Sequence, residues 1–207
     1  MNSRPVIRAI LWDMGGVLVR SEDLTPRQRL AQRYGMSLKE IYSLVFDSEI
    51  AVKATVGELP ESAVWEYVSK CLNLDPVGLA AFMQEFWSGD NLDTELYQFI
   101  KKMRASYKIG LLSNAWSGAR SVIDSRYHML DVFDVSVFSA EVGVAKPVPE
   151  IFQLILEKLG VEAGEAIFVD DFQANVDAAI ALGIHAVHFE NSLQARQTVL
   201  QILDGGN

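Results

Sequence analysis

The stretch AILWDMGGV, residues 9–17, is an apolar run that ends in an aspartate followed closely by two glycines. Two later stretches repeat this arrangement: IGLLSN (109–114) reaches Ser113, and AIFVDD (166–171) ends in Asp170 and Asp171. Apolar runs of this length are typical of the buried strands of a parallel sheet. Open α/β sheets bind their ligands just beyond the carboxyl ends of such strands. The three runs therefore predict a single crevice that holds three carboxylates and a hydroxyl.

The rest of the chain carries two different patterns. From about Leu24 to Ser88 the pattern is helical, with helices expected at 26–34, 38–46, 60–72 and 76–87. From Leu92 onward strands and helices alternate, which is typical of βαβ units. Strands are expected at 6–12, 107–112, 135–138, 166–169 and 184–189, and helices at 92–106, 117–127, 149–159, 173–182 and up to about 203. The predicted fold is α/β: a Rossmann-like doubly wound parallel sheet formed by residues 1–20 and 90–207, with an inserted α-helical cap domain, residues 21–89.

Composition restricts the class of protein. The 207 residues are 50% hydrophobic and 22% charged, which suits one or two packed folding units. A net charge of −9 disfavours nucleic acid and anionic membranes as partners. No apolar stretch is long enough for a membrane helix, and the single Cys71, expected to be a buried hydrophobe, cannot form an internal disulfide. We therefore expect a cytoplasmic protein, and the sequence leaves open whether it is a monomer or a homodimer.

The carboxylates predict a metal site. Asp13 follows its strand without a good helix start behind it, so a nucleophile or a metal ligand is favoured over a helix cap. The adjacent Asp170 and Asp171 raise each other's pKa unless a cation relieves the repulsion, and Mg²⁺ is the cation that suits oxygen ligands beside a phosphate. In a structural interpretation, Asp171 would cap the helix that begins near residue 173. Asn175 in that helix would either orient the carboxylates or face solvent.

Three further polar residues suit the binding of an anion. Lys146 lies in a loop stiffened by prolines, where an ammonium group would neutralise phosphate or carboxylate oxygens. Ser113 supplies a hydroxyl and, with Asn114, backbone amides at an expected helix start, where an anion is favoured. The other candidates are assigned to packing, namely the histidines at 128, 185 and 188 and the tryptophans at 65 and 87.

Taken in order, four stretches resemble the motifs of the haloacid dehalogenase superfamily of hydrolases. They are WDMGGVL (12–18), LLSN (111–114), VAKPVPEIF (144–152) and IFVDD (167–171), and the resemblance covers the whole chain. It implies a Rossmann-like core with a small helical cap inserted after the first strand. For most such members it also implies a Mg²⁺-dependent phosphatase that forms an aspartyl-enzyme intermediate with a small phosphorylated substrate.

The resemblance also implies roles for individual residues. Asp13 would attack phosphorus, and Ser113, Asn114 and Lys146 would bind the phosphate. Lys146 would in addition steady Asp13. The ligands of Mg²⁺ would be Asp13, the carbonyl of Gly15, Asp170 and Asp171. Positioning and charge neutralisation of this kind suffice in principle for transfer of a phosphoryl group.

One position departs from the family pattern. Gly15 stands where most phosphatases of the superfamily carry an aspartate that protonates the leaving oxygen and then activates water. Loss of a positioned acid or base removes about 10²- to 10⁴-fold in rate. A water molecule or a residue of the cap could substitute; the acidic candidates are Glu22, Asp23 and Asp47, none of them favoured by the sequence.

Two alternatives to a phosphatase remain at this point. A haloacid dehalogenase uses the same nucleophile without a metal, but the pair Asp170 and Asp171 argues against a metal-free site. A catalytically weak or inactive domain that binds a ligand or a partner is suggested by Gly15. The substrate would be selected by the cap, and Trp116 and residues 21–25 are expected to line the entrance.

Overall fold

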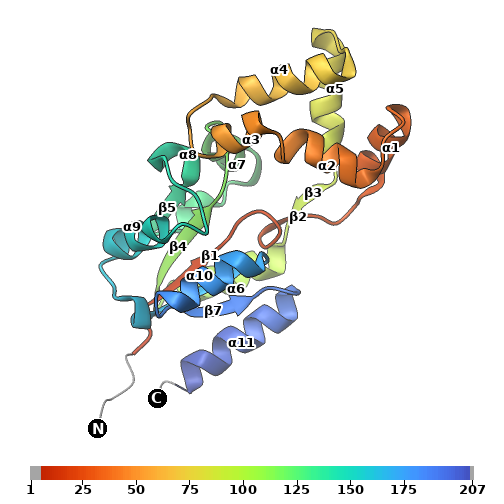
Figure 1. The fold of residues 1–207 in the computed structure, drawn as a ribbon. Coiled ribbons are helices and arrows are strands. Elements are labelled where there is room, and N and C mark those ends of the chain that lie inside the picture. The colour runs from red at the N-terminus through yellow and green to blue at the C-terminus, as the bar shows by residue number, and fades with distance from the viewer. Residues whose placement is uncertain (1–5, 206–207) are drawn as a thin grey trace.

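The computed structural model describes residues 6–205, so residues 1–5 and 206–207 of the predicted core domain lie outside the described part. Its centre is a five-stranded sheet in the order β5-β4-β1-β6-β7, with every neighbouring pair parallel (Figure 1). The strands are β1 (Ala9–Trp12), β4 (Lys108–Ser113), β5 (Val135–Phe138), β6 (Ala166–Asp170) and β7 (His185–His188). The predicted fold class is confirmed.

The central strand β1 shows why its sequence is apolar throughout. Ala9 and Leu11 point to one face, where they pack with α9 (Pro149–Leu159) and α10 (Gln173–Ala181). Ile10 and Trp12 point to the other face, covered by α6 (Thr94–Met103), α7 (Ala119–Tyr127) and α11 (Ser192–Asp204). Because both faces are buried, no position of the strand favours a polar side chain.

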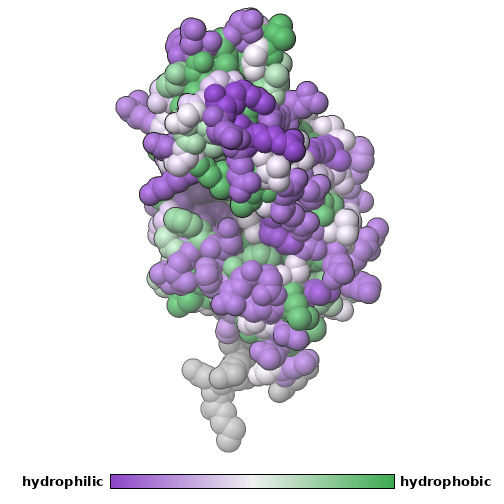
Figure 2. All heavy atoms as spheres, turned by 90° about the vertical axis from the view of Figure 1, so that its right-hand side faces the viewer, coloured by the Kyte–Doolittle hydropathy of each residue, from purple (hydrophilic) through white to green (hydrophobic). Residues whose placement is uncertain are grey.

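A helical insert separates β1 from the rest of the sheet. It consists of α1 (Thr25–Arg33), α2 (Leu38–Phe46), α3 (Glu49–Thr55), α4 (Glu61–Leu72) and α5 (Pro76–Trp87), which Figure 1 shows together at one end of the molecule. The insert has its own apolar cluster, which includes Leu30, Val64, Phe82 and Phe86. Figure 2 shows a hollow at mid-height of the molecule, between this end and the opposite one.

Several details of the prediction need correction. Two three-residue strands, β2 (Val19–Ser21) and β3 (Asp90–Leu92), form an antiparallel pair at the two ends of the insert, and they are too short to show a pattern in the sequence. The short helices α8 (Ser139–Val142), η1 (Leu130–Val132) and η2 (Ala163–Glu165) were also not predicted, and α3 lies in the stretch expected to be helical but was given no bounds of its own. Cys71 was expected to be buried and is exposed. No helix in the described range 6–205 has the length and apolarity needed to cross a membrane.

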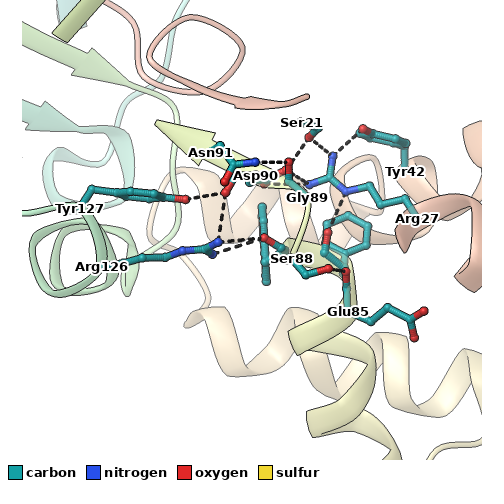
Figure 3. A network of polar contacts seen from close by, with 12 residues as sticks. Ser21, Arg27, Tyr42, Glu85, Ser88, Gly89, Asp90, Asn91, Arg126 and Tyr127 are labelled. Carbon is teal, nitrogen blue, oxygen red and sulfur yellow. Dashed lines mark hydrogen bonds and ion pairs between the residues drawn. The ribbon is translucent and has the colours of Figure 1, made fainter. Parts of the chain in front are cut away.

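A buried polar cluster fixes the insert to β2 and β3 (Figure 3). Arg27 donates from Nη2 to both carboxylate oxygens of Asp90, at 2.9 Å each, and from Nη1 to Ser21 and Tyr42. Ser21 also donates to Asp90. We call these four residues the Arg27 cluster. Arg126 of α7 donates to the carbonyl of Asp90 at 3.0 Å, so this cluster also contacts a helix of the sheet layer.

Candidate active site

The parallel sheet brings the predicted polar residues to one edge. β1 lies between β4 and β6, with Trp12 in register with Leu111 and Val169. Asp13 continues this ladder, because its N–H donates to the Val169 carbonyl at 2.9 Å. The carboxyl edge of the three strands therefore presents Ser113, Asp13 and the pair Asp170 and Asp171 side by side, as predicted from the sequence.

Lys146 reaches this edge from the loop before α9. Its Nζ lies 2.7 Å from Asp13 Oδ1 and 2.6 Å from Asp170 Oδ2. The three side chains are almost inaccessible, with exposed fractions of 5% for Lys146, 7% for Asp13 and 0% for Asp170. One ammonium group thus faces two carboxylates, and the buried group of three carries a net negative charge when all are ionised.

Asp170 has its oxygens engaged by protein donors. Besides Lys146, it accepts from Asn175 Nδ2 at 3.0 and 3.1 Å and from the backbone N–H of Phe172 at 2.8 Å. Asn175 therefore orients a carboxylate and does not face solvent, which resolves the alternatives left by the sequence. These hydrogen bonds hold Asp170 in one position, and Asp170 in turn holds Lys146.

Burial and charge act on the pKa values of this group. Burial raises the pKa of Asp13 to about 7, and the charge of Asp170 adds to the rise while Lys146 opposes it. Burial, followed by the charge of Asp170, also raises the pKa of Asp171. Burial disfavours the charged form of Lys146, but the charges of Asp13 and Asp170 prevail and raise its pKa. The negative charge of the three carboxylates is thus only partly compensated by Lys146, and a bound cation would lower their pKa values.

The donor set fits a small divalent ion. Carboxylate oxygens of Asp13, Asp170 and Asp171 lie within 4.8 Å of one another. Opposite ligands of an octahedral Mg²⁺ are about 4.2 Å apart, twice the usual distance from metal to oxygen. Three oxygens that span this range can share one ion after small side-chain movements. Hard carboxylate oxygens are also the ligand type that Mg²⁺ prefers.

The glycine pair after Asp13 has two distinct environments. Gly16 has φ +81°, and a Cβ built on it would lie 2.1 Å from Asp171 Oδ2. The close approach expected of this turn is therefore an approach to Asp171, and any other residue at Gly16 would strain the backbone and displace the Asp171 carboxylate. A Cβ on Gly15, by contrast, would meet no heavy atom within 4 Å, so this position has room for a side chain.

Ser113 and Asn114 differ from the prediction in one respect. Ser113 ends β4 with an exposed fraction of 1%, but α7 begins only at Ala119, so their amides do not lie at a helix start. The expectation of such amides was wrong because residues 114–118 form a loop. The Asn114 side chain accepts from the Lys146 N–H and donates to the Lys146 carbonyl, both at 2.8 Å. Asn114 therefore fixes the backbone that carries Lys146, a contact that sequence reasoning missed.

The other residues considered from the sequence lie in local contacts. Glu22 pairs with Arg20 at 3.1 Å, Asp47 accepts from Ser43 at 2.7 Å, and Asp23 accepts from the Thr25 N–H at 2.9 Å. His188 was assigned to packing, yet its Nε2 lies 3.0 Å from the carbonyl oxygen of Asp171. The sequence placed His188 near the end of a predicted strand, and the structure pairs it with Asp170. This position is the feature that could have indicated the contact.

Trp116 was expected to line the entrance, and the structure instead buries it to an exposed fraction of 9% among aromatic side chains of the insert. Phe172, next to Asp171, is the large apolar side chain that stays exposed beside the carboxylates, at 65%. It follows a strand end, where exposed residues adjoin a ligand site in this type of sheet.

Comparisons with known proteins point to one family of hydrolases. A family model described as haloacid dehalogenase-like hydrolase matches residues 7–183. By sequence, the chain is 23% identical over 197 residues to a sesquiterpene phosphatase of Aspergillus oryzae, with 95% of this chain and 96% of the relative covered. It is 27% identical over 192 residues to a phosphorylated carbohydrates phosphatase of Thermotoga maritima, with 88% and 84% covered.

The fold recurs in solved structures. A HAD family enzyme of Bacteroides thetaiotaomicron, crystallised in complex with magnesium and inorganic phosphate, superposes with a TM-score of 0.72. It is 23% identical in sequence, and the match covers 87% of this chain and 93% of that chain. At this level of identity the likeness shows a shared fold.

Proposed function

The chain belongs to the haloacid dehalogenase-like hydrolases, and we propose that it is a Mg²⁺-dependent phosphatase that acts on a small phosphorylated metabolite through an aspartyl-phosphate intermediate. The observation that carries this proposal is the buried ammonium group of Lys146 between Asp13 and Asp170, with Asp171 beside them. A phosphorylated carbohydrate is the first substrate class to try, because the Thermotoga maritima relative is named for it.

In this proposal Asp13 is the nucleophile. A carboxylate oxygen of Asp13 forms a bond to phosphorus while the ester oxygen of the substrate leaves with its electron pair and takes a proton from water. A second water then attacks phosphorus and gives a proton to the hydroxide that the first water left, which breaks the bond to Asp13 and releases inorganic phosphate with the Asp13 carboxylate restored. The raised pKa of Asp13 means that Lys146 is needed to keep the carboxylate ionised near neutral pH.

Lys146 and Ser113 position the phosphoryl group in this scheme. The ammonium group neutralises charge on the phosphoryl oxygens and holds Asp13 at the attack position. Ser113, at the end of the neighbouring strand, donates its hydroxyl to one of those oxygens, and Asn114 holds the Lys146 backbone. Asp13, Asp171, Asp170 and the carbonyl of Gly15 would hold Mg²⁺, which when bound supplies the positive charge that the carboxylates lack.

The open position at Gly15 limits the range of good substrates. No carboxylate lies there to protonate a leaving oxygen, and Glu22, Asp23 and Asp47 are engaged elsewhere. Proton transfer from solvent is less effective than transfer from a positioned acid, by about 10²- to 10⁴-fold. Esters whose leaving groups need little protonation should therefore react fastest.

The division into domains belongs to the same proposal. Residues 1–20 and 90–207 would form the core that carries the chemistry, and residues 21–89 would form the cap. β2 and β3 lie at the boundary, joined by the Arg27 cluster. The substrate would bind between the carboxyl edge of the sheet and the insert, so that residues of the insert select the leaving group.

Hydrolysis of p-nitrophenyl phosphate tests the proposal, with wild type and Asp13→Asn each assayed with Mg²⁺ and with chelator. The nitrophenolate leaving group needs little protonation, so Gly15 should not mask turnover. We expect activity that requires both Asp13 and Mg²⁺. Equal, negligible rates in wild type and Asp13→Asn would instead favour a binding domain, and chelator-resistant turnover would favour a metal-free hydrolase.

A further inference from the structure

The loop between β4 and α7, residues 114–118, contacts the candidate active site and the helical insert at the same time. It begins directly after Ser113 and ends where α7 starts. The first two residues of the loop, Asn114 and Ala115, contact the sheet layer, and the last three, Trp116 to Gly118, contact the insert.

The contacts on the active-site side are hydrogen bonds to the loop that carries Lys146 and to the first residues of α8. Asn114 bonds to both the N–H and the carbonyl of Lys146, each at 2.8 Å. The N–H of Ala115 donates to Ser139 Oγ at 2.9 Å, and its carbonyl accepts from the N–H of Ala140 at 3.3 Å. The backbone of Lys146 is therefore fixed by the first residue of the loop, which directly follows Ser113 at the end of β4.

The contacts on the insert side are aromatic and polar. The Trp116 ring lies 5.6 Å from the Phe46 ring and 5.8 Å from the Trp65 ring, between centroids, with an edge-on arrangement to Trp65. Trp65 Nε1 donates to Glu61 Oε1 at 2.9 Å, and the Glu61 N–H donates to Ser117 Oγ at 3.3 Å. A Cβ on Gly118 would lie 2.3 Å from Glu61 Oε2, so the chains meet closely.

We propose that Trp116 is a positioning residue: its burial among Phe46 and Trp65 couples the seating of the helical insert to the placement of Ser113 and Lys146. This rests on the proposed phosphatase function for its kinetic consequence, although the structural coupling does not. When the ring is removed, the loop loses its main anchor on the insert. Asn114 then no longer holds Lys146 in place against Asp13.

A purely structural role for Trp116 makes a different prediction, and the chain offers a matched control. Phe82 is another buried aromatic residue of the insert, stacked on Phe86 at 5.9 Å, with no aromatic contact to the loop. If Trp116 only packs the insert, then Trp116→Ala and Phe82→Leu should both lower thermal stability and leave kcat unchanged at temperatures where the protein is folded.

The experiment compares Trp116→Ala, Trp116→Phe and Phe82→Leu with wild type, using p-nitrophenyl phosphate and amide hydrogen exchange. We expect Trp116→Ala to lower kcat by about 10- to 100-fold, as small displacements of catalytic groups do, with recovery in Trp116→Phe and no change in Phe82→Leu. Exchange of the Ala115 and Lys146 amides should speed up by about 10-fold or more in Trp116→Ala alone.

The two readouts separate the two proposals. Unchanged exchange at Ala115 and Lys146 in Trp116→Ala, or an equal effect in Phe82→Leu, overturns the coupling whether or not the protein hydrolyses the ester. Absence of turnover in wild type, with faster exchange confined to Trp116→Ala, overturns the phosphatase proposal and supports the coupling. If Trp116→Ala does not fold, then Trp116→Leu replaces it in both measurements.

Discussion

Two buried cations, Arg27 and Lys146, differ in the negative charge that surrounds them. Arg27 faces one carboxylate, Asp90, which it holds through two bonds of 2.9 Å, and its remaining donors reach Ser21, Tyr42 and the Phe86 carbonyl. Its guanidinium group also lies over the rings of Tyr42 and Phe86, at 4.7 and 4.3 Å. In the Arg27 cluster, charge and hydrogen bonds are thus complete.

Lys146 faces two carboxylates with one charge, and a third, Asp171, lies beside them. A buried pair that is balanced needs no further ligand and serves to fix the fold. Burial raises the pKa of Asp13, the charge of Asp170 adds to the rise, and a cation would relieve such a group. The difference indicates which cluster holds the insert and which is suited to chemistry.

We call Lys146, Asp13, Asp170 and Asp171, in which carboxylates outnumber the one cation, the unbalanced cluster. The largest expected effect comes from removing its cation. Lys146→Met should lower kcat by about 10³- to 10⁵-fold, the range found when a cation on a transferring phosphoryl group is lost. It leaves the two buried carboxylates of Asp13 and Asp170 without a cation. Steady-state kinetics with p-nitrophenyl phosphate measure this, with Lys158→Met, an exposed lysine of α9, as the control that should match wild type.

Removing the cation of the Arg27 cluster should instead lower the stability of the protein. Arg27→Met leaves Asp90 buried and unpaired, which should lower the free energy of unfolding by about 3–5 kcal/mol. The control is Arg33→Met on the same helix, where the exposed pair with Glu85 should contribute about 0–1 kcal/mol. Urea denaturation distinguishes the two variants, and equal small losses would mean that the Arg27 cluster does not fix the insert.

The raised pKa of Asp13 makes stability depend on pH. Because the folded state binds this proton more tightly than the unfolded state, the contribution of Asp13 is most favourable at acidic pH. It is lost as pH rises toward its folded pKa of about 7. Without metal, Asp13→Asn should therefore be more stable than wild type at pH 8 by about 2–4 kcal/mol, with the difference shrinking as pH falls toward 5.

Urea unfolding at pH 5 and pH 8, with Asp177→Asn as the matched control, measures this effect. A pH-independent difference between Asp13→Asn and wild type would contradict the unbalanced charge. Adding Mg²⁺ should reduce the advantage of Asp13→Asn at pH 8, because the cation stabilises the ionised carboxylate of the wild type.

The smallest effect expected is a gain of function at Gly15. The open space at its Cβ position permits Gly15→Asp, which would place an acid near the leaving oxygen. The rate with an alkyl phosphate should rise by about 10- to 100-fold, toward the lower end of general acid catalysis, and much less with p-nitrophenyl phosphate. Gly15→Asn, similar in shape but without a carboxyl group, is the control and should show no gain.

The residues around Lys146 could be predicted from the sequence, whereas the Arg27 cluster could not, and the reason is physical. Asp13, Ser113, Asp170 and Asp171 each follow an apolar run, and parallel strands bring their carboxyl ends together, so local pattern and sheet geometry suffice. Arg27 and Asp90 lie 63 residues apart, each in a stretch without a distinguishing pattern. Only the packing of the insert brings them together.

The same reason explains the errors within the site. That Asn114 binds the Lys146 backbone depends on two loops 32 residues apart, and neither loop encodes the contact locally. Trp116 was expected to line the entrance, and the structure buries it instead. Its burial comes from Phe46 and Trp65, which belong to two helices of the insert.

The aspartyl-phosphate intermediate is tested most directly by stopping the reaction with acid during turnover of p-nitrophenyl phosphate with Mg²⁺ and mapping phosphorylation by mass spectrometry. We expect one phosphoryl group on the peptide that contains Asp13, absent in Asp13→Asn. Phosphate release by the wild type with no phosphoryl group on Asp13 at any time during turnover, or with one on another residue, would contradict this expectation.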